Sequence, residues 1–382
     1  MSKAPDIVAQ APRSSSDPGN RAEDREGGNV ASMEFHFADA FSVDEASWNH
    51  LFELSRTPNL FWNYEVLKSA RDVWESLSGM RIACGYSDGV LSFLMPVIEH
   101  RSTKGTTLEV LKIPTADNNE PLAPANDWEN ASRQFVRYLL ANPDVEALTC
   151  RLVTARFLDI LRDELDIAQV IVENRRSASV LKLPSSIDEY WSGFKSKTRN
   201  QLRRKLRKAT ENGLSFHVTS SRDAVDRLKL EHALERVTHL HRLRFDALDR
   251  KSFFVDEEIQ HFHQTIVRLP AMNALEILFT ECRLDDAVVG SMYGWRSGDN
   301  YVFLMIGFDP KLASLSIGTL LILTTIEHAI EQGVSRFDFK CGNESYKKRF
   351  TKDQYESYDL TVHLTRKAGL FSRLLSKWIR FR

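Results

Sequence analysis

The clearest chemical signal in the sequence is a polar loop that leads from an apolar strand into an apolar helix. Residues 301–308 are almost continuously apolar, as is typical of a strand buried on both faces. Ser314, Ser316 and Gly318 then precede a helix at residues 320–330. Free backbone N–H groups and the positive end of the helix dipole make such a loop an anion site, most often for phosphate. The plainer alternative, which the local spacing alone favours, is that Ser316 caps the helix and Gly318 relieves crowding.

Two ionisable side chains elsewhere are candidates for acid–base chemistry. Asp338 lies in a short apolar strand, where a buried carboxylate is costly unless it has a partner. It either forms a salt bridge, with Arg244 or Lys347, or acts as a base or substrate anchor. His241 has an unperturbed pKa near 6.5, which suits a base at neutral pH, although a histidine on a helix is more often structural.

Metal and disulfide chemistry are not expected. The four cysteines are far apart and form no CxxC pair, which argues against a zinc ribbon and gives no disulfide framework. The histidines of the pairs His239/His241 and His261/His263 are two residues apart and would not share a helical face. We therefore predict no metal site, and the cysteine usage is consistent with a reducing cytoplasm.

A basic segment at residues 195–208 contains eight Lys or Arg and no acidic residue. Apolar residues recur at helical spacing from Trp191 to Ala209, which predicts a helix with a narrow docking face. The cations either form a solvated face or contact RNA or a polyphosphate. The net charge of −1 and the lack of aromatic residues between these cations favour the solvated face.

These residues lie in a chain that reads as two α/β units of similar order. The first unit runs from a strand at residues 33–41 through an Asp88-Gly89 hairpin to a strand at 169–183. Pro184-Ser185-Ser186 is the expected linker. The second unit contains an expected antiparallel meander at residues 274–281, 288–296 and 301–308. The expected helices lie at residues 42–54, 61–77, 128–140, 155–165, 223–244 and 256–269. The expected fold class is therefore α/β (α+β).

Length and composition are those of a soluble globular protein. The 382 residues suggest about two domains, and 42% apolar and 27% charged residues are ordinary values. Residues 1–32 are rich in Ser, Gly, Pro and charge and should be disordered. With no apolar run of transmembrane length and no signal-peptide core, we expect a cytoplasmic protein. Residues 366–382 should form a basic amphipathic helix that docks on its own domain or lies on an anionic membrane surface.

Several motifs connect the second half to a known family. They are KSKTRNQLRRKLRKATENG, Gly307-Phe308-Asp309, Leu315-Ser316-Ile317-Gly318, Phe337-Asp338-Phe339-Lys340-Cys341-Gly342 and Tyr346-Lys347-Lys348-Arg349-Phe350. With the order of elements, they make the chain resemble the CelD/BcsL family of acetyltransferases, a GNAT family associated with cellulose and exopolysaccharide gene clusters. That family is similar to the FemX-type aminoacyltransferases, which carry two GNAT-like units. One position departs, since the family usually has Ser-Pro-Gly where this chain has Ser316-Ile317-Gly318.

The resemblance implies two tandem GNAT-like units at residues 33–184 and 185–365, each a mixed, largely antiparallel sheet flanked by helices. In the second unit, the strand before the loop would bind the pantetheine of CoA and the loop its pyrophosphate. The residues implied in cofactor binding are Ile306, Gly307, Phe308, Ser314, Ser316, Gly318 and Thr319. Acyl transfer also needs a base, an oxyanion stabiliser and an acid for the leaving thiolate. The candidate catalytic residues are Asp338, His241 and, as the acid, Tyr346; the candidate substrate anchors are Arg244 and Lys347.

Three functions stay open. The leading one is an acyltransferase that uses acetyl-CoA, and no metal, to acylate an amine or hydroxyl of a sugar, polysaccharide precursor or related cell-envelope metabolite. The second takes the acyl group from aminoacyl-tRNA, and the basic helix at residues 195–208 would bind the RNA. The third is a non-catalytic accessory protein that scaffolds a polysaccharide synthase. A saccharide or small-molecule acceptor is thus expected. A nucleic-acid partner is expected only for the aminoacyl-tRNA-dependent function. A peripheral association with the inner membrane or a synthase is compatible with the acetyl-CoA-dependent function and with the accessory role.

Overall fold

The computed structural model describes residues 32–365, except residues 56–58, 104, 167–168, 223–226, 271, 273 and 343. The predicted disordered tail (residues 1–32) lies outside the described residues except for Ser32. The predicted C-terminal amphipathic helix (residues 366–382) lies wholly outside them.

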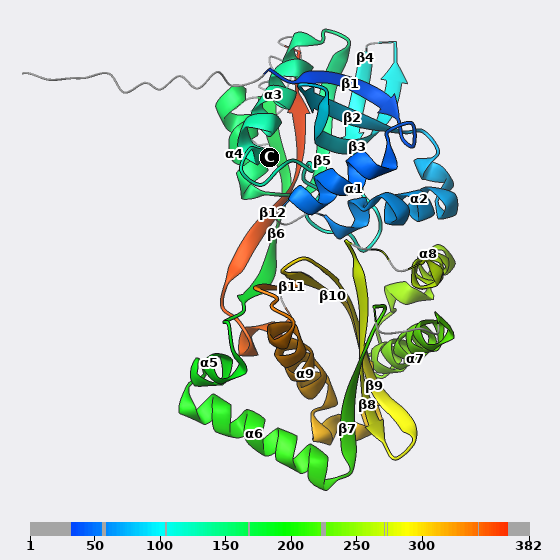
Figure 1. Ribbon diagram of the computed structural model, residues 1–382, viewed down its shortest axis with the longest axis vertical. Coiled ribbons are helices and arrows are strands. Elements are labelled where there is room, and N and C mark those ends of the chain that lie inside the picture. The colour runs from blue at the N-terminus through cyan, green and yellow to red at the C-terminus, as the bar shows by residue number, and fades with distance from the viewer. Residues whose placement is uncertain are drawn as a thin grey trace, which may run out of the picture. The chain divides into compact units, whose positions relative to one another are not determined.

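The described residues form two halves that begin with the same order of elements, namely a strand, two helices, three strands, a helix and a strand (Figure 1). A helix and a further strand then end the first half, and a further strand ends the second. The first half consists of β1 (Glu34–Asp39), α1 (Glu45–Leu54), α2 (Tyr64–Val73), β2 (Met80–Ser87), β3 (Val90–Ser102), β4 (Gly105–Val110), α3 (Trp128–Ala141), β5 (Val145–Thr154), α4 (Ala155–Glu164) and β6 (Val170–Lys182). Two helices, α5 (Ile187–Ser192) and α6 (Ser196–Glu211), follow it. The second half consists of β7 (Leu214–Ser220), α7 (Arg227–Asp246), α8 (Glu257–Arg268), β8 (Glu276–Leu284), β9 (Ala287–Ser297), β10 (Asn300–Phe308), α9 (Ile317–Glu331), β11 (Arg336–Cys341) and β12 (Gln354–His363).

The strands of the described residues form one twelve-stranded sheet in the order β1-β2-β3-β4-β5-β12-β6-β11-β10-β9-β8-β7. The two halves exchange their last strands, because β12 pairs with β5 and β6, and β6 pairs with β11. Each half has one parallel pair, β4 with β5 and β10 with β11, and the other pairs in the described sheet are antiparallel. The predicted mixed α/β fold of two similar units is confirmed. The predicted boundary at residues 184–185 stays a prediction, and β4 and β12 were not predicted.

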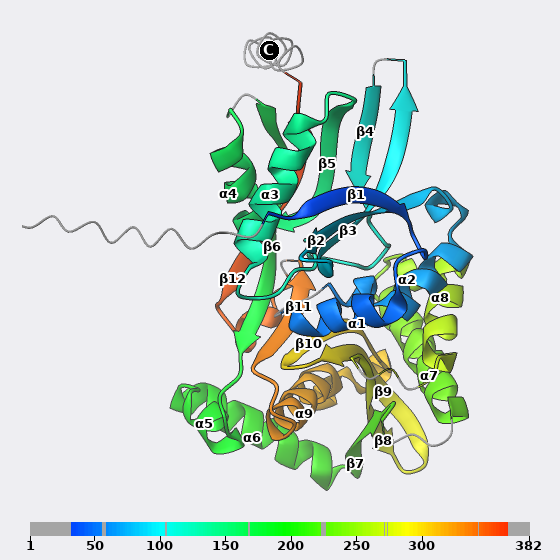
Figure 2. The same ribbon diagram turned by 45° about the horizontal axis from the view of Figure 1, so that its top comes forward.

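Helices cover both faces of the second half's strands, with α7 and α8 on one face and α9 on the other (Figures 1 and 2). The α8 face also packs against the first half. The ring centres of Phe61 and Trp295 lie 4.7 Å apart, and those of Trp74 and Phe262 lie 4.9 Å apart. All four side chains are buried, and large buried aromatic side chains dominate the energetics of a core. This aromatic cluster therefore holds the two halves together.

A glycine sets the distance between α7 and β10. A Cβ atom on Gly307 would lie 2.2 Å from the backbone nitrogen of His241, so no other residue lets the helix approach this closely without a backbone shift. The close approach places the C-terminal part of α7, with His241 and Arg244, directly against β10.

Candidate functional site

The parallel strands β10 and β11 separate soon after they start. They pair only from Asn300 to Val302, although β10 continues to Phe308. A bulge lies just beyond this point, where Leu304 has no partner in the register of β10 with β9. Within the described residues, β10 beyond Val302 therefore has a backbone edge that no strand pairs with on the β11 side. Such an edge can hydrogen-bond an extended ligand as it would an added strand.

The start of α9 is an open helix N-terminus. Ser316 has a left-handed backbone conformation (φ 61°), and its side chain makes no capping hydrogen bond. Its carbonyl oxygen accepts hydrogen bonds from the N–H groups of Thr319 and Leu320 at 2.9 and 3.2 Å. The N–H groups of Ile317 and Gly318 precede the first intrahelical bonds and so have no acceptor within the helix. The positive end of the helix dipole lies at the same place.

Ile317 stands at the position where the resemblance predicts Pro, and its side chain is fully buried. It packs against β9, where a Cβ atom on Gly290 would lie 2.4 Å from the Ile317 Cγ2 atom. The left-handed Ser316 makes the turn that leads into α9. Ile317 is thus free to anchor the start of α9 in the core.

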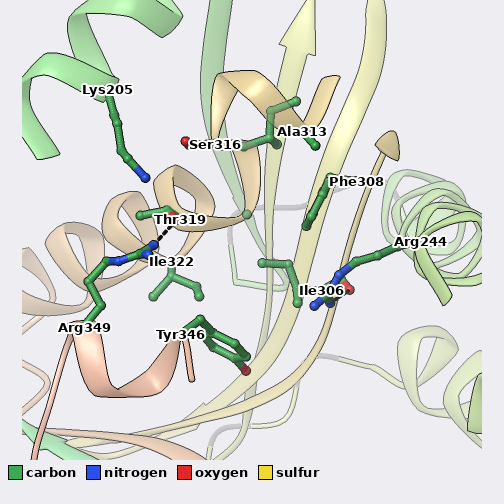
Figure 3. A pocket seen from close by; sticks show the side chains of 12 residues that line it. Lys205, Arg244, Ile306, Phe308, Ala313, Ser316, Thr319, Ile322, Tyr346 and Arg349 are labelled. Atoms are coloured by element: carbon green, nitrogen blue, oxygen red, sulfur yellow. Dashed lines mark hydrogen bonds between the residues drawn. The ribbon is translucent and has the colours of Figure 1, made fainter. Parts of the chain in front are cut away.

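A cavity of about 310 Å³, the α9 cavity, lies at this helix start. Strand β10, the loop and α9 contribute Ile306, Phe308, Ala313, Ser316, Ile317, Gly318, Thr319 and Ile322 to its wall. Three cations also line it, Lys205 of α6, Arg244 of α7 and Arg349, and no acidic residue does (Figure 3). Among the described residues, none of the three cations has a carboxylate within ion-pair distance. The α9 cavity is therefore suited to an anion.

Arg244 is the most buried of these cations. Its Nη1 atom donates to the carbonyl oxygen of Ile306 at 3.4 Å, and its guanidinium lies 5.2 Å from the centre of the Phe308 ring. Burial lowers the pKa of Arg244, but a guanidinium stays charged in proteins. Because a desolvated cation is costly without a counter-charge, an anionic ligand at this place would offset that cost.

A second cavity of about 520 Å³, the inter-unit cavity, lies between the two halves. The Lys340 ammonium group donates to the carbonyl oxygen of Thr115, and the N–H of Cys341 donates to the Asp117 carboxylate at 2.9 Å, so β11 is tied to the first half here. The residues that line both the α9 cavity and the inter-unit cavity are Arg244, Ile306 and Tyr346. The two cavities thus meet beside the part of β10 that no longer pairs with β11.

Tyr346, the predicted acid, lies in the loop after β11 and is half-buried. Burial raises the pKa of its phenol, and the negative charge of Glu344 raises it further, against the opposing effect of Arg244. The phenol is therefore protonated at neutral pH. It lies where a leaving thiolate would need a proton if the donor reached the junction of the cavities.

His241, the predicted base, lines the inter-unit cavity and is buried. Its Nδ1 atom lies 2.9 Å from the Ser252 hydroxyl oxygen. Burial and the positive charge of Arg244 lower the pKa of His241 to about 4. The imidazole is thus neutral at pH 7 but a weak base, and its catalytic role stays a prediction.

Asp338 lines neither of these cavities but a smaller one between the halves. Its carboxylate accepts hydrogen bonds from the Arg336 guanidinium (2.9 Å), the Lys340 N–H (2.7 Å) and the Tyr355 hydroxyl (2.9 Å). These contacts match the alternative of a structurally bonded carboxylate, although with Arg336 in place of the expected Arg244 or Lys347.

Lys347 lines the inter-unit cavity, but its ammonium group is already surrounded by acceptors. It donates to the carbonyl oxygens of Lys340, Cys341 and Gly342 at 3.1, 3.2 and 3.4 Å and pairs with Glu344 at 2.9 Å. Its role as a substrate anchor stays a prediction, while its contacts stabilise the turn that carries Tyr346.

The structure brings together most of the residues expected at the cofactor site. Ile306, Phe308, Ser316, Gly318 and Thr319 line the α9 cavity. Gly307 instead packs against α7, and Ser314 is exposed on the 3₁₀-helix at Pro310–Leu315 without lining the cavity. The sequence reasoning missed Lys205 and Arg349 as cavity residues. The sequence contained features that could have pointed to them, since Lys205 lies in the basic segment at residues 195–208 and Arg349 lies in the Tyr346–Phe350 motif.

No cluster of three or more His, Cys, Asp or Glu side chains that could hold a metal ion occurs in the described part of the chain. In the same residues, no helix is both long enough and apolar enough to cross a membrane.

Comparison with known proteins agrees with this geometry. Residues 196–348 match the model of the Acetyltransferase (GNAT) domain family. No curated protein matches the sequence.

Among solved structures, FemX superposes with a TM-score of 0.59 at 9% identity, covering 88% of this chain and 99% of that one. A conserved protein of unknown function from Bacteroides thetaiotaomicron has a TM-score of 0.55 at 11% identity, with 86% and 100% covered. The C-terminal domain of a putative lysylphosphatidylglycerol synthetase from Agrobacterium fabrum has a TM-score of 0.51 at 11% identity, with 86% and 94% covered. At such identities these likenesses show the fold alone. The match of residues 196–348 to the acetyltransferase domain model is what supports an acyltransferase activity for this protein.

Proposed function

We propose that the protein transfers an acyl group from acyl-CoA, with acetyl-CoA as the first candidate, to an amine or hydroxyl group. The observation that carries this proposal is the α9 cavity. It combines an open helix N-terminus, three cations that have no carboxylate partner among the described residues and the unpaired edge of β10. The pyrophosphate of CoA would bind at the N–H groups of Ile317 and Gly318. The pantetheine arm would then follow β10, where its amides find unpaired backbone groups.

In this proposal the thioester reaches the junction of the two cavities and the acceptor enters through the inter-unit cavity. The acceptor's amine or hydroxyl attacks the thioester carbonyl carbon and forms a tetrahedral oxyanion. Backbone N–H groups near the Leu304 bulge are the proposed donors to this oxyanion. The C–S bond then breaks, and the CoA thiolate takes the proton of the Tyr346 hydroxyl. The acceptor's own proton leaves through the inter-unit cavity, and the protonated phenol is restored from solvent.

The acceptor that we propose is a sugar, a polysaccharide precursor or a related cell-envelope metabolite. The inter-unit cavity is within the size range of small-molecule sites and is lined by polar and charged groups from both halves. The link to polysaccharide synthesis, and with it a peripheral position at a membrane or synthase, is supported by the resemblance to the CelD/BcsL family. The match to an acetyltransferase domain favours this over a non-catalytic accessory role.

A second candidate donor is aminoacyl-tRNA, and one observation favours it. Helix α6 carries exposed cations, including Lys197, Arg203, Arg204 and Lys208, while Lys205 of the same helix lines the α9 cavity. An RNA whose acyl end entered this cavity would thus find a basic surface beside it. The fold shared with FemX agrees with this candidate as well as with the first.

Calorimetric titration of the full chain with acetyl-CoA tests the proposal, with Thr319→Glu and Thr319→Gln as a matched pair. Thr319 lies in the first turn of α9, where a glutamate is compatible with the helix but places a negative charge in the cavity. We expect micromolar binding by the wild-type chain and by Thr319→Gln, and a loss of at least about tenfold with Thr319→Glu. A folded wild-type chain that does not bind millimolar acetyl-CoA, but forms a salt-sensitive complex with aminoacyl-tRNA, would favour the second donor.

A further inference from the structure

Two of the three cations of the α9 cavity stand apart from the junction with the inter-unit cavity. Lys205 and Arg349 line the α9 cavity alone, whereas Arg244 lines both. Figure 3 shows Lys205 and Arg349 on one side of the cavity, next to Thr319, with Phe308, Ile306 and Arg244 on the other. The cavity therefore has a cationic pair at some distance from the place where the thioester would react.

Arg349 is held in position by the start of α9. Its Nη1 atom donates to the Thr319 hydroxyl oxygen at 2.7 Å. Lys205 comes from a different element, the basic helix α6, and is half-buried. An arginine oriented by a hydrogen bond and a lysine with three rotatable donors together suit a phosphate group.

These two cations also repel each other in the absence of a ligand. Burial lowers the pKa of Lys205, and the positive charges of Arg349 and then Arg204 lower it further. Since neither Lys205 nor Arg349 has a carboxylate partner among the described residues, their repulsion is not compensated within this part of the protein. A bound dianion would remove it.

We propose that Lys205 and Arg349 bind the third phosphate of the donor, the 3′-phosphate on the adenosine ribose of CoA, and so select CoA over donors that lack it. The inference rests on the proposed acyl-CoA function and deepens it. The pyrophosphate lies at the N–H groups of Ile317 and Gly318, and the pantetheine arm leads away from it to the junction at Tyr346. The adenosine end must then lie at the other side of the pyrophosphate, where Lys205 and Arg349 are the cations that line the cavity away from the junction. A phosphate monoester carries close to two negative charges at neutral pH, which the two cations match.

The test compares CoA with 3′-dephospho-CoA, which keeps the pyrophosphate and the pantetheine arm. Both ligands are titrated calorimetrically into the full wild-type chain, Lys205→Met and Arg349→Met. The control is Lys208→Met, which removes the same charge from an exposed position of α6 that does not line the cavity. We expect the wild-type chain to bind CoA about tenfold more tightly than 3′-dephospho-CoA, a difference of about 1.4 kcal/mol. Lys205→Met and Arg349→Met should each weaken CoA binding and so remove most of that preference. Their affinity for 3′-dephospho-CoA should stay within about twofold of the wild-type value. Lys208→Met should bind both ligands within about twofold of the wild-type affinities.

The outcomes separate this assignment from the proposed function. Equal affinity of the wild-type chain for the two ligands overturns the assignment but leaves the acyl-CoA function in place. Equal weakening of both ligands by Lys205→Met and Arg349→Met also overturns it, because the two cations then act on the pyrophosphate. A folded wild-type chain that binds neither ligand refutes the acyl-CoA function and the assignment with it.

Discussion

The Arg244 guanidinium donates a hydrogen bond to the carbonyl oxygen of Ile306, 3.4 Å away, and both residues line both cavities. This contact joins the end of α7 to the free edge of β10. It is possible because Gly307 lets α7 approach β10 at backbone distance. Two elements that are far apart in the sequence thus bring a cation and an unpaired strand edge to the same place.

Arg244→Met should weaken acetyl-CoA binding by at least about tenfold, because the cavity loses its most buried cation. Arg244 is half-buried and has no carboxylate partner in the part of the chain that the structure describes, so its removal should leave the free energy of unfolding unchanged or raise it by about 1 kcal/mol. Calorimetry and urea unfolding measure the two effects. The matched control is Arg242→Met, an exposed arginine of the same helix outside both cavities, which should alter neither. Equal losses of affinity in the two variants would contradict the role of Arg244.

Tyr346→Phe should lower kcat by about 10²-fold or more and leave the affinity for CoA nearly unchanged, because the phenol acts on the leaving thiolate. Release of the CoA thiol in the presence of an acceptor measures the rate. Since burial raises the pKa of Tyr346, the wild-type rate should show no loss from phenol ionisation up to about pH 10. A variant with wild-type kcat would remove Tyr346 from the mechanism.

Acid should destabilise the protein through His241. Its pKa is about 4 in the folded chain and near 6.5 when unfolded, so the unfolded state binds more protons between these values. The stability from the neutral imidazole is therefore present above pH 6.5 and is lost as the pH falls toward 4. Between pH 7 and pH 5 the loss from this group should be about 2 kcal/mol.

His241→Asn is the variant that measures this contribution, because an asparagine amide can take the place of Nδ1 beside Ser252. Its free energy of unfolding should fall less than that of the wild-type chain between pH 7 and pH 5, by about 2 kcal/mol. The buried His263, whose pKa burial lowers to about 3, is common to both proteins and cancels. If the free energies of unfolding of the two proteins changed with pH in parallel, burial would not lower the pKa of His241 in the folded chain.

Asp338→Asn should separate the structural and catalytic roles of this residue. The substitution leaves the Arg336 guanidinium without its carboxylate and should destabilise the fold by about 2–3 kcal/mol. Because Asp338 lines neither the α9 cavity nor the inter-unit cavity, kcat and CoA affinity should stay near the wild-type values. A 100-fold lower kcat with an unchanged free energy of unfolding would instead support the predicted catalytic role.

The sequence predicted those parts of the fold whose pattern is local. Strand β10 was recognised because its residues are almost all buried and apolar. β12 was not, because it lies in the middle of the sheet but carries charges: Glu356 pairs with Arg175, and Asp359 with Arg176. These partners come from β6 in the first half, so a single-strand pattern does not reveal them.

For the candidate site, too, the sequence predicted the residues that are contiguous and missed those that come from distant segments. The loop and helix residues of the α9 cavity are contiguous in sequence, and the resemblance to a known family, rather than their spacing alone, predicted them. Lys205 and Arg349 reach the cavity from elements more than a hundred residues apart, and only tertiary packing puts them on one wall. The structural and functional alternatives for Asp338 stayed open because the sequence does not show that Tyr355 and the Lys340 N–H hydrogen-bond it.

A crystal structure of the full chain with acetyl-CoA measures the central claim most directly, since it gives the position of the thioester. The pyrophosphate should contact the N–H groups of Ile317 and Gly318, and the thioester sulfur should lie within hydrogen-bonding reach, about 3 Å or one water molecule, of the Tyr346 hydroxyl. CoA bound outside the α9 cavity would contradict the account. So would CoA in this cavity with its thiol end directed away from the inter-unit cavity.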